Sequence, residues 1–289
     1  MIPASFDYHA PASLDEALSL LQTHGYDAKI LTGGQSLLPM MKLRLAEPEH
    51  IIDLNGIPDL SYIREADGCL AIGALTREVD VESSALVQNL LPILHDTGKH
   101  IADPQVRNLG TLGGNLAHGD PGNDHPATML ALDARVKILG PGGERTVAVR
   151  EFFVGFFETT LAYDEILTEI QIPLPPAMSG GAYMKLERKV GDFATVGVAA
   201  QVSLDSGGRC ARAGIGLTNV SDVPVYAADA GSRLVGSALT DDDLRAAANL
   251  ASAASRPSDD LRGSAQYKEA MVRVLTTRTL RLAIERAQA

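Results

Sequence analysis

The sequence predicts an α+β fold in two parts, the second smaller than the first. A helix pattern followed by two short apolar strand patterns occupies residues 13–55. The proline- and glycine-rich run 173–181 is incompatible with a helix or a central strand. Beyond it, strand patterns come first and helix patterns follow, an order typical of α+β domains. The expected domains are 1–177, with subdomains of about 1–55 and 56–177, and 178–289.

The first helix is predicted from a capping box. In this motif the Ser13 hydroxyl accepts a hydrogen bond from a main-chain N–H of the first turn, and the Glu16 side chain reaches back to the N–H at the start of the helix. Apolar residues recur at helical spacing until His24, where the following glycine ends the pattern. Buried strands are expected at 28–31 and 49–54, which gives a small β-α-β layout.

Turn residues and apolar patterns predict the remaining elements of the first domain. These are a hairpin over 62–73, a helical stretch from Thr76, a short helix over 126–132, a hairpin across 140–143 and a strand over 165–172. Four of the six phenylalanines fall within 152–157, and we expect them to pack in a core. The elements expected in the second domain are strands at 182–188, 201–204 and 211–217 and helices at 244–254 and 265–287.

Composition excludes several classes of protein. The net charge of −11 argues against a nucleic-acid partner, which would need a basic face. The sequence contains no run of about eighteen apolar residues, so no membrane span is predicted. No secretory signal is visible either, and a cytoplasmic protein is expected. Cys69 and Cys210 are too few for an iron–sulfur cluster and are expected to be free thiols.

Two glycine-rich stretches are the candidate ligand-binding segments of the sequence. Residues 32–36 read Thr-Gly-Gly-Gln-Ser and residues 110–115 read Gly-Thr-Leu-Gly-Gly-Asn. Their N–H groups can approach a phosphate because no Cβ stands in the way. Neither stretch is a P-loop or a G-x-G-x-x-G fingerprint. Either one alone could be an ordinary tight turn, but two such turns could hold the two phosphates of a dinucleotide.

With their flanks, these stretches resemble the FAD-binding medium subunit of the molybdenum hydroxylases. This is the group of carbon monoxide dehydrogenase, with the homologous flavin domain of xanthine dehydrogenase. The matching motifs follow the family's order over nearly the whole chain. They are Thr32–Leu37, Pro39–Arg44, Gln105–Asn108 with Gly110–Asn115, Asp120–Pro121 with Asp124, Glu165–Leu167 before Ile172–Pro173, and Lys185 and Arg188 ahead of Asp192–Ala194.

The resemblance implies FAD as cofactor and a two-part FAD-binding domain of the vanillyl-alcohol-oxidase type, followed by a small flavoprotein domain. Asp124 would bind the ribose end of FAD, Lys185 would contact the flavin, and Ile101 and Leu167 would line it. No catalytic residue and no metal ligand is expected. The full set of implied cofactor-binding residues is Ile30, Leu31, Thr32, Gly33, Gly34, Gln35, Ser36, Leu37, Ile101, Gly110, Thr111, Gly113, Gly114, Asn115, Asp124, Leu167 and Lys185.

The residues taken singly leave simpler interpretations open. Asp124 could cap the helix that follows it, and Lys185 could be a solvated surface lysine. The resemblance implies that Phe193 could cover the flavin, although packing in a core is the favoured interpretation. A hydrolase triad of Ser36, His118 and Asp124 lacks a G-x-S-x-G elbow. The histidines expected to be scattered polar loop residues rather than metal ligands are His95, His100, His118 and His125.

The resemblance also implies an oxidoreductase that works in a complex. A large molybdenum-cofactor subunit would oxidise the substrate, a small subunit would relay electrons through [2Fe–2S] clusters, and this chain would pass them through FAD to an external acceptor. A dimer of heterotrimers is the expected assembly. Two alternatives stay open, a stand-alone FAD-dependent oxidoreductase and a non-catalytic nucleotide-binding assembly subunit. The first lacks a convincing general base in the sequence.

Overall fold

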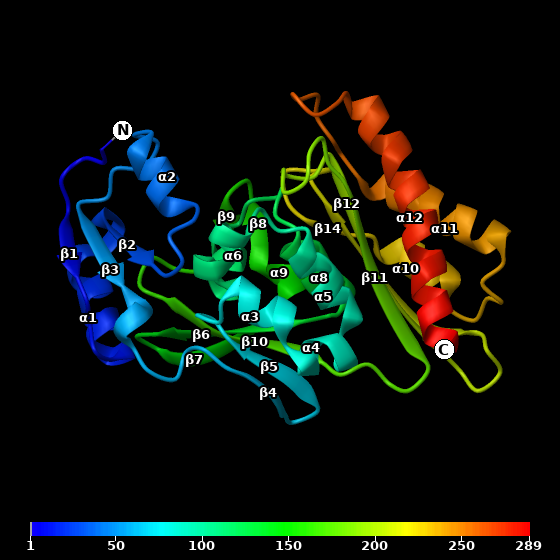
Figure 1. Ribbon diagram of the computed structural model, residues 1–289, viewed down its shortest axis with the longest axis horizontal. Coiled ribbons are helices and arrows are strands. Elements are labelled where there is room, and N and C mark those ends of the chain that lie inside the picture. Colours follow the sequence, from blue (N-terminus) through cyan, green and yellow to red (C-terminus); the bar gives the residue numbers. More distant parts are fainter. Residues whose placement is uncertain (1) are drawn as a thin grey trace.

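The computed structural model describes residues 2–289, which form three larger sheets with helices around and between them (Figure 1). The N-terminal sheet, in blue, lies at one end of the molecule. A five-stranded sheet lies in the middle, and a four-stranded sheet with the last helices, in yellow-green to red, lies at the other end (Figure 1). This is the α+β fold predicted from the sequence.

The N-terminal sheet is parallel, with strand order β1-β3-β2. It comprises β1 (Asp7–His9), β2 (Ala28–Leu31) and β3 (His50–Asp53), with α1 (Leu14–His24) packed on one face. The predicted helix and both predicted strands are confirmed. The sequence analysis missed β1 and α2 (Leu37–Lys42), because both are too short to establish a period.

The middle sheet has the antiparallel order β4-β5-β10-β6-β7, which confirms both predicted hairpins. Its strands are β4 (Ile63–Ala66), β5 (Cys69–Gly73), β10 (Ile166–Pro173), β6 (Arg135–Gly140) and β7 (Gly143–Ala148). A four-residue helix, α9 (Val149–Phe152), follows β7.

The helical stretch predicted from Thr76 is three helices, and Thr76 itself lies outside them. They are α3 (Glu78–Ser83), α4 (Ala85–Leu90) and α5 (Pro92–Lys99). Helix α4 begins after Ser84, which caps it by accepting a hydrogen bond from the N–H of Val87. Pro92 cannot continue α4 because it lacks an N–H group, and it is the first residue of α5.

The C-terminal sheet is antiparallel in the order β11-β12-β13-β14, as predicted for this part. Its strands are β11 (Ser179–Leu186), β12 (Val196–Leu204), β13 (Cys210–Thr218) and β14 (Val225–Tyr226). Strand β12 starts five residues before the predicted strand, because Val196–Ala200 is buried on both faces and lacks the alternation that signals a strand.

Helices cover both faces of this sheet (Figure 1). One face carries α10 (Ala228–Leu234), α11 (Asp241–Ala254) and α12 (Ala265–Gln288), and the latter two confirm the predicted closing helices. The opposite face packs on α5 and on α8 (His125–Ala131) from the first part of the chain. A Cβ at Gly216 would lie 1.9 Å from the carbonyl oxygen of Ala127, so only glycine permits this close contact.

The phenylalanine cluster was predicted to be buried, and this is only partly correct. Phe152 is fully buried, whereas Phe156 is 65% and Phe157 43% exposed. These two lie at the turn between β8 (Phe153–Gly155) and β9 (Glu158–Thr159), a two-stranded hairpin whose tip has no sheet to pack against.

Both cysteines are free thiols, as predicted. Within residues 2–289, no helix combines the length and the apolar character that crossing a membrane would require.

Candidate functional site

The two glycine-rich stretches are in direct contact. The first follows β2, and the second begins after α6 (Pro104–Leu109) and runs into the first turn of α7 (Leu112–Ala117). A Cβ at Gly33 would lie 2.5 Å from the carbonyl oxygen of Leu109 and 2.7 Å from Cα of Gly110. The hydroxyls of Thr32 and Thr111 are hydrogen-bonded at 2.9 Å. Two segments some eighty residues apart therefore form one continuous backbone surface.

The second stretch is not a free turn, contrary to expectation. Thr111 caps α7 by accepting from the N–H of Gly114 at 3.1 Å, so both glycines lie in the first helical turn. The N–H of Gly113 donates to the carbonyl of Ala74 at 3.0 Å. A threonine N-cap stabilises a helix by about 1 kcal/mol, which offsets about half of the helix-propensity cost of two glycines at about 1 kcal/mol each. The N–H groups of this stretch are thus largely used within the protein.

The first stretch keeps its donors free. In the described part of the chain, no protein acceptor takes a hydrogen bond from the main-chain N–H groups of Gly33, Gly34, Gln35 or Ser36. Gly34 has φ +70°, a conformation that glycine adopts without strain. Unpaired N–H groups along such a turn form a recognised kind of anion-binding surface.

Two side chains missed by the sequence analysis tie the stretches together. The amide of Asn55 donates to the carbonyl of Thr32 at 2.8 Å. Arg77 donates to Oδ1 of Asn55 at 2.7 Å and, through its other terminal nitrogen, to the carbonyl of Leu109. Asn55 lies in a short helical turn directly after β3, and no local sequence signal marks either Asn55 or Arg77 as part of a site.

Asp124 and Lys185 form a buried ion pair. Nζ of Lys185 lies 2.8 Å from Oδ2 of Asp124 and donates to the carbonyl of His100 at 2.9 Å. The phenol of Tyr183 donates to the other oxygen of Asp124. The two charged side chains are only 1% and 7% exposed, so the surface-lysine interpretation is wrong.

The helix-cap interpretation of Asp124 is also wrong, because its side chain makes no capping hydrogen bond to α8. Burial raises the pKa of Asp124, and the charge of Lys185 opposes this shift. Burial also raises the pKa of Tyr183 well above its ordinary value, with the charge of Asp124 adding to it, so the phenol stays protonated and donates.

The ion pair is linked to the glycine stretches by an asparagine pair. The side-chain amide of Asn123 donates to the carbonyl of Asn115 at 2.9 Å. Oδ1 of Asn115 is buried and has no donor among residues 2–289. A buried acceptor without a partner is costly, so it indicates a place for a ligand donor. This observation fits FAD, whose ribose and adenine groups carry donors.

The two predicted apolar lining residues are both buried. Ile101 follows His100, whose carbonyl binds Lys185, and it is 8% exposed. Leu167 lies in β10 and is 6% exposed, and α7 packs beside that strand. The remaining predicted positions, Ile30, Leu31 and Leu37, flank the first glycine stretch in β2 and at the start of α2. The two glycine-rich stretches are thus in direct contact, and Asn123, which precedes Asp124, links the ion pair to the second of them.

Phe193 does not pack in a core, as had been favoured, since it is 47% exposed. Its loop is held by Asp192, which pairs with Arg262 at 3.0 Å and with Arg188 at 3.1 Å. The hydrogen bond from Arg262 lowers the pKa of Asp192 to about 2. The ring approaches Gly122, near the asparagine pair.

Replacing Phe193 by alanine is expected to change the free energy of unfolding by no more than about 0.5 kcal/mol, the usual range for exposed side chains. Urea unfolding of the two proteins measures this. A loss of about 3–5 kcal/mol, as for a core phenylalanine, would contradict the exposed position.

Two of the four histidines that were expected in loops, His95 and His125, lie in helices. His125 is fully buried in α8, with Nε2 2.6 Å from the carboxylate of Glu78, and so is not a loop residue. His95 is not one either, since it lies in α5 with Nδ1 2.8 Å from the carbonyl oxygen of Glu82. The triad of Ser36, His118 and Asp124 does not form, because the partners of Asp124 are Lys185 and Tyr183.

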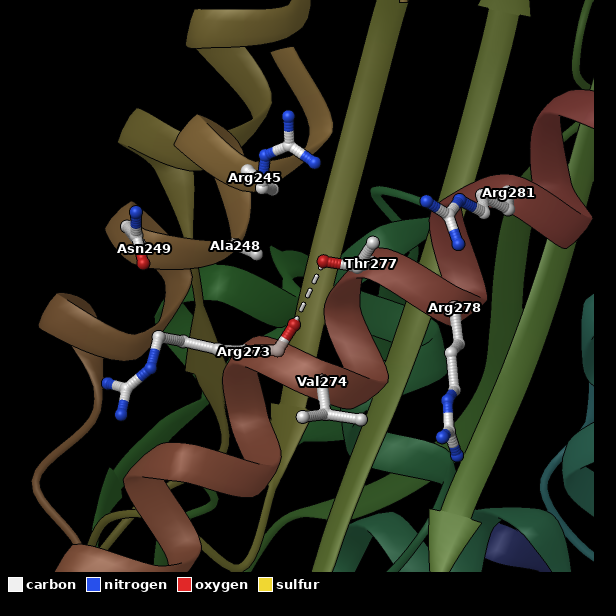
Figure 2. Close-up of a pocket in the computed structure, with 8 residues that line it drawn as sticks. All are labelled: Arg245, Ala248, Asn249, Arg273, Val274, Thr277, Arg278 and Arg281. Atoms are coloured by element: carbon white, nitrogen blue, oxygen red, sulfur yellow. Dashed lines mark hydrogen bonds between the residues drawn. The ribbon is translucent and has the colours of Figure 1, made fainter. Parts of the chain in front are cut away.

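A groove of about 450 Å³ lies elsewhere, between α11 and α12. Figure 2 shows that the guanidinium groups of Arg273 and Arg278 point in different directions instead of converging on one ligand. Arg245 and Arg281 are paired with Asp242 and Asp241. None of the predicted cofactor-binding residues lines this groove.

Comparison with known proteins finds similarity to FAD-binding proteins over nearly the whole chain. Residues 4–175 match the family of FAD-binding domains in molybdopterin dehydrogenase, and residues 181–283 match the C-terminal domain of the carbon monoxide dehydrogenase flavoprotein. The carbon monoxide dehydrogenase medium chain of Hydrogenophaga pseudoflava is 50% identical and is covered over 98% of both chains. That of Afipia carboxidovorans is 48% identical, covering 100% of this chain and 99% of the relative.

The fold agrees with these relatives. A solved structure of carbon monoxide dehydrogenase from Hydrogenophaga pseudoflava, which lacks the Mo-pyranopterin moiety of the molybdenum cofactor, superimposes with a TM-score of 0.97 over 99% of each chain at 50% identity. The chain therefore belongs to the family of FAD-binding medium subunits of molybdopterin dehydrogenases, and it is an oxidoreductase subunit whose cofactor is FAD.

Proposed function

We propose that the chain is the electron-transfer subunit of a heteromeric molybdenum hydroxylase. The observation that carries this proposal is the contact between the two glycine-rich stretches, at Gly33 and Gly110. The division at residue 177, with subdomains of 1–55 and 56–177, is proposed with it. The family matches over residues 4–175 and 181–283 support that division.

The chain's part is to bind and orient the cofactor. The N–H groups from Gly33 to Ser36 hold the diphosphate, and Thr111 fixes the second stretch against the first. Asn115 offers its buried Oδ1 to a donor of the cofactor. FAD supplies the redox chemistry, since it takes up electrons singly and releases them in pairs.

The Asp124–Lys185 pair forms a further part of the proposed FAD site. Asp124 accepts from the ribose end of FAD, and Lys185 contacts the flavin portion. Ile101 and Leu167 provide apolar walls, in keeping with their burial. Because Lys185 also binds the carbonyl of His100, it keeps Ile101 in position beside the cofactor.

The proposed partners are a small subunit with two [2Fe–2S] clusters and a large molybdenum-cofactor subunit, assembled as a dimer of heterotrimers. The medium chains of carbon monoxide dehydrogenase support this assembly by their similarity over the full length. The substrate is bound in the large subunit, and this chain delivers electrons to an external acceptor. Free thiols at Cys69 and Cys210 fit a cytoplasmic location.

Co-expression with the two candidate partner subunits tests this proposal. The chain should co-purify with both, and the flavin absorbance of the complex should bleach when substrate is added without an acceptor. Steady turnover of an organic substrate by the isolated FAD-loaded chain would instead identify a stand-alone oxidoreductase and refute the proposal.

Arg77→Ala is expected to weaken FAD binding about ten- to a hundredfold, because it removes charge-assisted hydrogen bonds that hold Asn55 and Leu109 together. Flavin fluorescence titration measures the affinity. Arg135→Ala, at an exposed arginine of β6, is the matched control and should bind FAD as the wild type does. Equal affinity for both variants would show that the bridge does not shape the site.

A further inference from the structure

Three histidines from separate elements meet in the N-terminal subdomain, outside the FAD site. His9 comes from β1, His24 is the last residue of α1, and His50 begins β3. Their ligand atoms all lie within 4.8 Å of one another, and all three side chains are partly buried. We propose that His9, His24 and His50 together bind one divalent transition-metal ion of the Zn²⁺ class.

The spacing of the nitrogens fits this kind of ion. Nε2 of His9 lies 3.2 Å from Nδ1 of His50. In a tetrahedral Zn²⁺ site, with Zn–N bonds of about 2.0–2.1 Å, two nitrogen ligands are about 3.3 Å apart. The ring of His24 stacks on that of His50 with centroids 3.7 Å apart, and it offers a ring nitrogen within 4.8 Å of the ligand atoms of the other two. Imidazole is a preferred ligand of such ions.

The fold holds these side chains on one face of the sheet. Asp7 is paired with His50 in the parallel β1–β3 register, and His9 lies two residues further along, so all three point to the same side. Helix α1 packs against β3, which brings His24 to the edge of that face. Strand pairing thus positions His9 and His50, and the packing of α1 on β3 positions His24.

The charges nearby favour a cation. Oδ2 of Asp7 lies 3.9 Å from Nδ1 of His50, where its negative charge can partly balance the charge of a bound ion. The chain as a whole carries a net charge of −11. A bound ion would cross-link β1, α1 and β3, and β3 adjoins β2, the strand that leads into the first glycine stretch.

The test uses the full-length, FAD-loaded chain without a histidine tag, freed of metal by a chelator and titrated with Zn²⁺ by calorimetry. One Zn²⁺ should bind per chain in a saturable manner. His24→Gln and, separately, His9→Gln should weaken binding at least about tenfold, since even residues that only support metal ligands have effects of that size. Gln22→Ala, at an exposed position of the same helix turn, is the control and should bind as the wild type does.

Circular dichroism checks that each variant is folded. Absence of saturable Zn²⁺ binding to the wild type would overturn the proposal. So would a Zn²⁺ affinity in both histidine variants equal to that of the wild type, because the three rings would then only stack. Neither result bears on FAD binding, which is measured separately from flavin absorbance of the same samples.

Discussion

Gly33→Ala is expected to weaken FAD binding about ten- to a hundredfold. The new Cβ would lie 2.5 Å from the carbonyl oxygen of Leu109 and 2.7 Å from Cα of Gly110. Both are backbone atoms that cannot rotate away, so the two glycine-rich stretches must separate. Overpacking of this kind costs about 1–3 kcal/mol, and here the cost falls on the surface that binds the diphosphate.

Flavin fluorescence titration measures this loss, and urea unfolding reports whether the variant is folded. Gly142→Ala is the matched control, because a Cβ there would meet no atom within 4 Å and its φ is not in the left-handed region. The account is wrong on this point if the two alanine variants bind FAD with the affinity of the wild type.

Lys185→Met is expected to destabilise the protein by about 3–5 kcal/mol, because it leaves the buried carboxylate of Asp124 without its cation. Glu187, whose carboxylate lies 3.6 Å from Nζ of Lys185, loses the same partner. Burial raises the pKa of Asp124 and the charge of Lys185 opposes this shift, so Lys185→Met removes the group that favours the charged carboxylate.

Urea unfolding of four proteins, the wild type, Lys185→Met, Asp124→Asn and the double variant, separates the pair's coupling from other effects. The double variant should recover most of the loss, since it removes both charges. A loss below about 1 kcal/mol in Lys185→Met would be the value of an exposed pair and would contradict the buried geometry.

Most of the fold could be predicted because its elements carry local signals. The helix after Ser13 has a capping residue and a helical period, and the hairpins have turn residues between apolar strands. Strand β1 and helix α2 are too short to show a period. The early start of β12 was missed since a strand buried on both faces shows no alternation.

The residues of the candidate site could be predicted only where the local sequence itself indicates a binding role. The glycine stretches were found from composition and family motifs, whereas Asn55 and Arg77 act through hydrogen bonds that depend on tertiary structure. The burial of Lys185 could not be predicted because it depends on Asp124 and His100, which lie far away in sequence. The histidine cluster was missed for the same reason, as its members come from three elements.

The central claim is that the first glycine-rich stretch, locked against the second, binds the diphosphate of FAD through main-chain N–H groups. A crystal structure of the chain reconstituted with FAD tests this most directly. The account predicts phosphate oxygens within hydrogen-bonding distance of the N–H groups of Gly33 to Ser36, with Thr32 and Thr111 still in contact. A diphosphate bound away from both stretches would contradict it.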